Sequence, residues 1–203
     1  MKQEIPRVDG SVLATVEIDC PDSCLYVTKL GLAAVEAVKS DISLEGADLQ
    51  GADLRGSKLY LADLRGANLH RACLQGANLY SACLQRADLR MADLRGAYMQ
   101  EVDLRGADMR LANLQGAYLH GSDLHGADLR GAGLTVLHLD DTTVYIQPEY
   151  ILIGREYHTV DKWFSFTDEE IYKKRIDALT WWKVWKPTIQ AIHATLTHTI
   201  RRK

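Results

Sequence analysis

The stretch ADLRGANLHRACLQGANLY, which spans residues 62–80, has a leucine at every fifth position. These leucines are Leu64, Leu69, Leu74 and Leu79. A helix repeats its apolar residues at a period of about 3.6 and a strand at a period of about 2, so neither element explains this spacing. The same spacing continues from Leu44 to Leu139 through twenty consecutive units, and methionine replaces leucine only at Met99 and Met109.

A second regularity accompanies the leucines, because the residue two positions before each of them is almost always small. It is alanine in fifteen of the twenty units, and glycine follows two positions after the leucine in eleven. In the position two residues before the leucine, only the outermost units carry a large residue, Ile42 and Leu137. A chain that turns inward once per five residues winds around an axis, and its stacked windings bury one apolar column. Alanine is needed because the narrow interior holds one large side chain per corner, and glycine permits the turn.

These five-residue words, of the form A-[D/N]-L-x-G, resemble the repeats of the pentapeptide-repeat proteins. The resemblance covers Asp41 to about Asp140 and implies a mainly β fold, the right-handed quadrilateral β-helix. In that family four words form one coil, so twenty words imply about five coils, or ~24 Å at a coil spacing of ~4.8 Å. The repeat has no insertion, so functions that projecting loops confer on some family members are not expected here.

The flanking segments predict a domain at either end of the repeat, so that residues 1–40, 41–140 and 141–203 form three parts. Alternating residues in Ser11–Ile18 predict a strand, and apolar spacing in Thr28–Lys39 predicts an amphipathic helix. An open β-helix end exposes leucines and unpaired backbone groups, so this strand and helix are interpreted as an N-terminal cap.

The C-terminal part predicts strands within Val144–Ile153, broken at Pro148, and then a short helical turn at 159–163. Thr167 and Glu170 form a capping box, which predicts the start of a long helical stretch that Pro187 should kink or split. Either this stretch seals the tube, or it pairs with a second copy in a homodimer, as the C-terminal helices of some family members do. The candidate dimerisation residues are Trp181, Trp182, Trp185, Ile189 and Ile192. The tail is also similar to those of phage- and prophage-encoded pentapeptide-repeat proteins, which suggests such an origin.

Four words per coil would place residues twenty apart on one face of the tube. The first face then carries the arginines Arg90, Arg110 and Arg130 beside the aspartates Asp88, Asp108 and Asp128. The opposite face, called the tyrosine face below, carries Tyr60, Tyr80, Tyr98 and Tyr118. Exposed aromatic residues are typical of docking surfaces, although a stacked ladder could equally serve only to stabilise the tube. The charged rows have the same two interpretations, a partner-binding patch or ion pairs that keep the surface soluble.

The charge balance restricts the possible functions. The chain has a net charge of −3, and residues 41–140 contain thirteen acidic and ten basic residues. Some pentapeptide-repeat proteins imitate duplex DNA, bind DNA gyrase and protect cells from quinolones, which the resemblance makes a candidate function. Mimicry needs a dense negative surface, yet nine words carry Asp before the leucine and seven carry Arg after it. A nucleic-acid-binding groove would be strongly basic, so direct nucleic-acid binding is not expected either.

Signals for catalysis, cofactors and metals are missing from the sequence. It contains no glycine-rich phosphate loop and no nucleophile elbow. Cys20 and Cys24 lack the second Cys/His pair of a zinc site, and His193 and His198 do not have the spacing of a helical metal pair. The chain lacks an apolar run of ~18 residues and an export signal, so a membrane is not an expected partner. The four cysteines are expected to be reduced thiols in the cytoplasm.

Together these observations favour a non-enzymatic protein that binds a protein partner through the faces of a rigid β-helix, as an inhibitor or anti-defence factor. The first alternative is a DNA mimic that inhibits or protects DNA gyrase. The second alternative is a structural spacer between the terminal modules.

Overall fold

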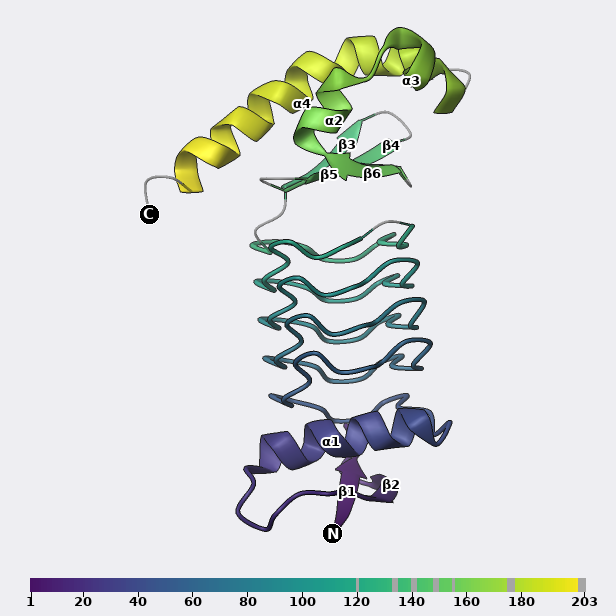
Figure 1. Ribbon diagram of the computed structural model, residues 1–203, viewed down its shortest axis with the longest axis vertical. Helices are drawn as coiled ribbons and strands as arrows, with labels where there is room; N and C mark the ends of the chain where they lie inside the picture. The colour runs from purple at the N-terminus through teal and green to yellow at the C-terminus, as the bar shows by residue number, and fades with distance from the viewer. Residues whose placement is uncertain are drawn as a thin grey trace. The chain divides into compact units, whose positions relative to one another are not determined.

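A computed structural model describes residues 1–119, 121–132, 135–139, 142–147, 150–154, 156–174 and 178–200. The chain divides into two compact units, Met1–Leu134 and Thr135–Lys203. The first contains an N-terminal segment and a stack of coils, and the second contains a sheet with three helices (Figure 1).

The coils of the first unit stack at a spacing of twenty residues (Figure 1). Parallel bridges join residues twenty apart, from Asp48 with Asn68 to Asp108 with Asp128. Each bridge uses two backbone hydrogen bonds: Leu49 N donates to Asn68 O at 2.8 Å, and Asn68 N donates to Ala47 O at 2.9 Å. Four words of five residues therefore make one coil, as the resemblance to the pentapeptide-repeat proteins implies.

The interior of the stack is the predicted column of leucine and alanine. The leucine and methionine positions from Leu44 to Leu129 are all at most 6% exposed. The alanines before them are buried too, except Ala127, which is half-buried. A short turn ends each word, as where Ala67 N donates to Leu64 O at 3.1 Å. The large side chain is thus enclosed by the small residues and backbone of neighbouring words, which is the reason for one large residue per corner.

The N-terminal segment contains two antiparallel strands, β1 (Lys2–Pro6) and β2 (Val12–Glu17), and the helix α1 (Tyr26–Lys39). β2 and α1 lie where the sequence predicts a strand and a helix, whereas β1 was not predicted. The end of β1 and the beginning of α1 both bond to the first coil: Asp48 N donates to Pro6 O at 2.7 Å, and Asp53 N donates to Val27 O at 3.0 Å. These bonds satisfy backbone groups of the first coil, and the role of the segment as an N-terminal cap stays a prediction.

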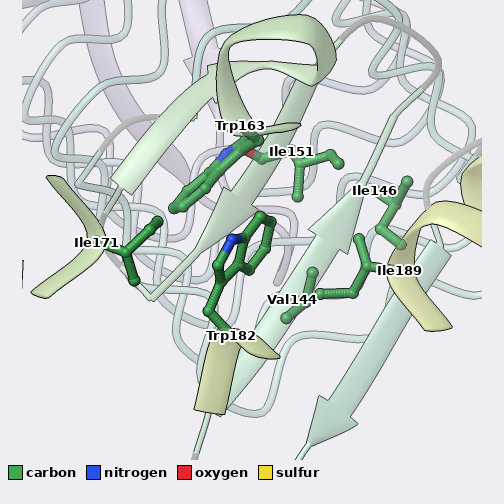
Figure 2. Close-up of a cluster of buried hydrophobic side chains, with 7 residues drawn as sticks. All are labelled: Val144, Ile146, Ile151, Trp163, Ile171, Trp182 and Ile189. Atoms are coloured by element: carbon green, nitrogen blue, oxygen red, sulfur yellow. The ribbon is translucent and has the colours of Figure 1, made fainter. Parts of the chain in front are cut away.

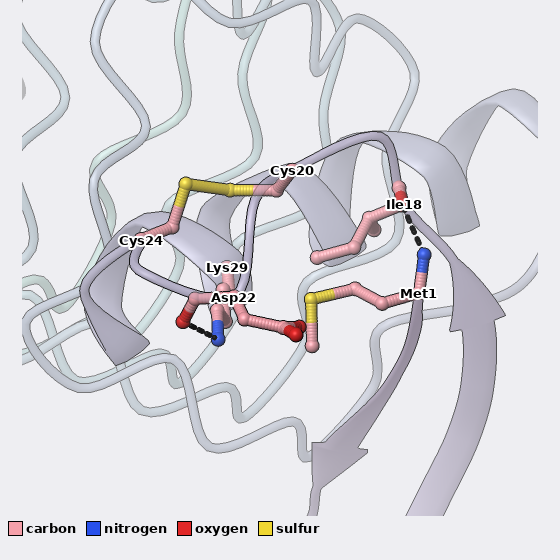
Figure 3. Close-up of a disulfide and its surroundings, with 6 residues drawn as sticks. All are labelled: Met1, Ile18, Cys20, Asp22, Cys24 and Lys29. Atoms are coloured by element: carbon pink, nitrogen blue, oxygen red, sulfur yellow. Dashed lines mark hydrogen bonds between the residues drawn. A yellow bond between two sulfur atoms is a disulfide. The ribbon is translucent and has the colours of Figure 1, made fainter.

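The cysteines before α1 correct one prediction. Cys20 and Cys24 form a disulfide across the turn between β2 and α1 (Figure 3), so they are not reduced thiols. A four-residue separation in a turn brings the two sulfur atoms together, which the sequence spacing alone did not distinguish from two free thiols. Cys73 and Cys83 are free and half-buried. The cytoplasmic location stays a prediction.

The second unit is built on an antiparallel sheet in the order β3 (Thr135–Leu139), β4 (Thr142–Ile146), β5 (Tyr150–Ile153) and β6 (Glu156–Thr159). The helices α2 (Val160–Ser165), α3 (Asp168–Lys174) and α4 (Ala178–Ile200) follow. Their apolar side chains form one core with a face of the sheet (Figure 2). The buried members of this core are Val144, Ile146, Ile151, Trp163, Ile171, Trp182 and Ile189.

Two features of this unit differ from the sequence-based expectations. Residues 135–139, assigned to the last two words of the repeat, form β3, which pairs with β4. In the last of these words a leucine, Leu137, stands where the repeat has a small residue, and two large side chains do not fit one corner. Helix α4 runs through Pro187 and is not split there, contrary to one of the two expectations for this residue. The expected tryptophans lie in its N-terminal half. Pro148, the predicted break between strands, lies outside the described residues.

Candidate interaction surfaces

The outer surface of the coil stack is dominated by ion pairs formed within single words. In the sequence D-L-R, the aspartate and the arginine lie two residues apart in an extended segment and therefore point to the same side. Arg90 shows the geometry: its Nε donates to Asp88 Oδ1 at 2.8 Å and its Nη2 to Asp88 Oδ2 at 2.5 Å. The same fold-back occurs in seven words, which contain Arg55, Arg65, Arg90, Arg95, Arg105, Arg110 and Arg130.

On the first face these pairs join into a ladder along the tube. Arg90 Nε lies 3.7 Å from Asp108 of the next coil, and Arg110 Nε lies 3.7 Å from Asp128. The side-chain hydrogen bond from Arg130, followed by the one from its backbone N–H and then by the charges of Arg130 and Arg110, holds the pKa of Asp128 at about 2. The structure therefore brings the predicted residues Arg90, Arg110 and Arg130 together in one row, but each guanidinium is already engaged by a carboxylate.

The tyrosine face has a different chemistry. Its tyrosines are half exposed, at 52% for Tyr60, 43% for Tyr80, 47% for Tyr98 and 36% for Tyr118. The rings of Tyr98 and Tyr118 stack with centroids 5.2 Å apart, and Tyr80 donates its hydroxyl hydrogen to Glu101 at 2.9 Å. None of the seven Asp–Arg pairs lies on this face in the part of the chain that the structure describes. It is thus aromatic and poor in charge, whereas the other three faces carry paired charges.

An exposed leucine extends the tyrosine face, and sequence reasoning missed it. Leu61 is 67% exposed and occupies a corner position where most words have glycine, with a φ of 61°. A β-carbon in this left-handed region is sterically unfavourable. The signal that could have identified it is the loss of glycine at a corner directly after Tyr60.

Two open depressions lie on the first unit, and neither is an enclosed pocket. One follows a single column of the tube and is lined by Glu45, Arg65, Gly66, Gln85, Arg86 and Arg105. The other lies where the N-terminal segment meets the first coil, and is lined by Pro6, Tyr26, Leu30, Asp48, Gln50, Gly51 and Arg71. Neither brings together a nucleophile, a base and an oxyanion donor, which an acyl-transfer site would need.

The candidate dimerisation residues are placed inside the second unit. Trp182 is 3% exposed and Ile189 is fully buried, and both pack in the core of the same chain. Trp181 and Trp185 are half-buried against that core. Ile192 lies in α4, but its side chain is outside the described part. Trp182 and Ile189 therefore cannot face a second copy unless this packing is lost, and a homodimer stays a prediction.

Metal and membrane sites were searched over the same described ranges. No group of three or more His, Cys, Asp and Glu side chains there could hold a metal ion. Of the described helices, none is both long and apolar enough to cross a bilayer.

A stack of twenty-residue coils with a leucine and alanine interior defines the class of repeat solenoids, whose working surfaces are their outer faces. Residues 42–79, 72–110 and 97–135 match the family model of pentapeptide repeats, in eight copies. The chain belongs to the pentapeptide-repeat family through this region. Pentapeptide-repeat proteins fold as right-handed quadrilateral β-helices and are generally non-catalytic structural or interaction proteins.

Solved structures with similarity to the chain are also pentapeptide-repeat proteins. Rfr23 from the cyanobacterium Cyanothece 51142 is 38% identical over 43% of this chain and 59% of its own, with a TM-score of 0.42. A protein from Nostoc Pcc 7120, alr5209, is 30% identical over 47% of this chain and 73% of its own, with a TM-score of 0.36.

A third similar structure is QnrB1, a plasmid-mediated fluoroquinolone resistance protein, which is 22% identical over 43% of this chain and 48% of its own, with a TM-score of 0.29. This chain thus spans less than two thirds of the length of Rfr23 and of QnrB1. No curated protein sequence matches the chain significantly.

Proposed function

We propose that this protein is a non-enzymatic interaction protein that binds a protein partner through the tyrosine face of a rigid β-helix. The observation that carries the proposal is the contrast between this face and the other three. Interface centres are enriched in tyrosine and depleted of charged residues, and the tyrosine face has this composition. Its four tyrosines are fixed on coils that repeat every twenty residues, so a partner would meet a preorganised surface.

The alternative interpretation of this face, a ladder that only stabilises the tube, accounts for only part of it. Tyr98 and Tyr118 stack on each other, whereas no ring pair joins Tyr60 or Tyr80 to another described aromatic residue. All four keep at least a third of their surface exposed, with Leu61 beside them. A ladder that served stability alone would gain from rings that cover each other along the whole face.

The first alternative, DNA mimicry toward gyrase, is less well supported. Mimicry needs carboxylates that a DNA-binding protein can contact, but seven of the nine aspartates before a leucine are engaged by an arginine of the same word. A gyrase supercoiling assay tests this alternative. Inhibition or protection at stoichiometric protein would favour it, and an unchanged reaction at protein excess would remove it.

A site-specific cross-linking experiment tests the proposed surface. A photo-reactive amino acid at Tyr80 or Tyr98 is expected to capture one partner in the source cells, and the same group at Arg90 or Arg110, on the opposite face, is not. The proposal fails if capture occurs only from the first face. If the tyrosine face captures a partner, the identity of that protein decides whether this protein acts as an inhibitor or an anti-defence factor.

Binding of the purified partner supplies the quantitative test. The double change Tyr98→Ser and Tyr118→Ser is expected to weaken binding at least ~10-fold, because aromatic residues at an interface centre often contribute more than ~1 kcal/mol each. Tyr26→Ser is the matched control, since Tyr26 is 57% exposed but lies on α1. The spacer alternative predicts full activity even when the tyrosine changes are combined with charge reversal at Arg90, Arg110 and Arg130.

A further inference from the structure

The turn between β2 and α1 is closed by a covalent bond that can be made and broken. Cys20 and Cys24 enclose only Pro21, Asp22 and Ser23 between their disulfide-bonded sulfur atoms (Figure 3). Both cysteines are half-buried and the three residues between them are mostly exposed, so a small thiol can reach the bond.

The beginning of α1 depends on this turn because the helix has no strong start of its own. Its N-cap is Leu25, whose side chain forms no capping hydrogen bond, and the first turn contains no acidic residue. Leu25 is 72% exposed and Tyr26 is 57% exposed, so packing contributes little here. One hydrogen bond joins the helix to the turn, from Lys29 Nζ to Asp22 O at 2.9 Å (Figure 3), and the turn itself is closed by Cys24 N, which donates to Pro21 O at 3.0 Å.

The same part of α1 contacts the first coil of the β-helix. Val27 O accepts the hydrogen bond from Asp53 N at 3.0 Å, and at the other end of α1 Ala37 O accepts from Ile42 N at 2.9 Å. One turn later, Gly31 lies so close to the carbonyl of Asp53 that a β-carbon would stand 2.0 Å from its oxygen. Leu30, at 1% exposed, packs beside it. A shift at the start of α1 would therefore uncover the part of the first coil around Asp53.

We propose that the Cys20–Cys24 disulfide is a thiol-sensitive modification site that holds the beginning of α1 on the first coil. A dithiol reductant attacks one sulfur atom as its thiolate, and the Sγ–Sγ bond breaks as a mixed disulfide forms. The cysteine that was not attacked leaves as a thiolate in this step, and the second thiolate of the reductant then attacks the reductant's own sulfur in the mixed disulfide and releases the other cysteine. Two electrons and two protons pass to Cys20 and Cys24, and the reductant becomes a disulfide. Reduction frees the turn, loosens Val27 from Asp53 and uncovers this part of the first coil.

Hydrogen exchange on the full chain tests this proposal. After treatment with dithiothreitol, the amides of residues 26–31 and of Asp53 are expected to exchange at least ~10-fold faster, because local opening governs their rates. The amide of Asp108, deep in the stack, is expected to keep its rate. Equal rates at residues 26–31 and Asp53 before and after reduction would overturn the proposal.

Two variants assign the effect to the correct cysteines. Cys20→Ser with Cys24→Ser is expected to exchange like the reduced protein in either buffer, while Cys73→Ser with Cys83→Ser keeps the full response to dithiothreitol. Thiol titration of the protein after oxidised glutathione is expected to count two thiols of the four cysteines. A count of four would show that the disulfide does not form and would also overturn the proposal.

Discussion

At the scale of single residues, the corners of the coils place an unusual demand on the backbone. Gly96 has a φ of 62° and Gly76 a φ of 64°, in the left-handed region that favours glycine. Several corners nevertheless carry a side chain, as Met91 does at a φ of 58° and Arg86 at 57°. Steric space is not the limit, because a β-carbon at Gly96 would meet no atom within 4 Å. The limit is the local energy of the left-handed conformation.

Gly96→Ala is therefore expected to lower the free energy of unfolding by about 1 kcal/mol, because alanine resists the positive φ that glycine accepts. Met91→Ala is the control, since that corner already holds a residue with a β-carbon and the side chain is 45% exposed. It is expected to change stability by less than ~0.5 kcal/mol. Urea denaturation followed by circular dichroism measures both, and equal values for the two variants would refute the argument.

Some residue-level features could be predicted from the sequence because their cause is local. The capping box is one: Thr167 Oγ1 accepts from Glu170 N at 3.3 Å, and Glu170 Oε2 accepts from Thr167 N at 2.8 Å. The leucine and alanine positions are another, because a fixed spacing of five determines which side chains point inward. The disulfide could not be predicted, since it depends on the path of the chain through a turn, whereas the loss of glycine after Tyr60 could have identified the exposed Leu61.

At the scale of elements, periodic segments were predictable and short strands were not. α1 begins two residues before its predicted start and ends at the predicted Lys39. β1 and β6 have only five and four residues, and their apolar residues alternate weakly. They are strands because they pair with β2 and β5, and the sequence alone does not show this pairing. β3 was hidden because Leu139 continues the repeat spacing, whereas Leu137 in the same word breaks the size rule.

The helices of the second unit depend on the buried indole of Trp163. This side chain is 3% exposed, and its Nε1 donates to Ile151 O at 2.7 Å, which ties α2 to β5. Trp163→Phe removes the donor and some packing volume, and it is expected to destabilise the unit by about 1–3 kcal/mol. Val184→Ala, at a 60% exposed position of α4, should cost less than ~0.5 kcal/mol.

Tryptophan fluorescence measures this effect selectively, because all four tryptophans lie in residues 163–185 of the second unit. The prediction concerns the midpoint of the fluorescence transition in urea. A Trp163→Phe variant that unfolds at the wild-type midpoint would show that the indole does not link α2 to the sheet.

At the scale of the whole molecule, the Asp–Arg pairs make stability depend on acid pH. Arg65 and Ser43 hold the pKa of Asp63 at about 2, and Arg130 does the same for Asp128. An aspartate in the unfolded chain has a pKa of about 3.9, so the unfolded state takes up protons first as the pH falls. The contribution of these pairs is fully present above pH ~4 and is lost between pH ~4 and ~2.

The thermal midpoint of the first unit is accordingly expected to fall between pH 4 and 2, and less so at high salt, where exposed pairs are screened. In Arg130→Gln, the pKa of Asp128 is expected to rise toward its ordinary value of about 3.9, measured by carboxyl carbon NMR. An unchanged pKa in this variant would contradict the pairing.

The arrangement of four chemically different faces rests on one geometric claim, that residues twenty apart stack and residues ten apart lie on opposite faces. Nitroxide labels on cysteines introduced at Arg90 and Arg110, in a chain whose native cysteines are serine, test it most directly. Adjacent coils are separated by ~4.8 Å, so this pair is expected to show strong dipolar broadening, and a pair at Arg90 and Gln100 much weaker broadening. Stronger broadening for the pair ten residues apart would contradict the stacking and the tyrosine face with it.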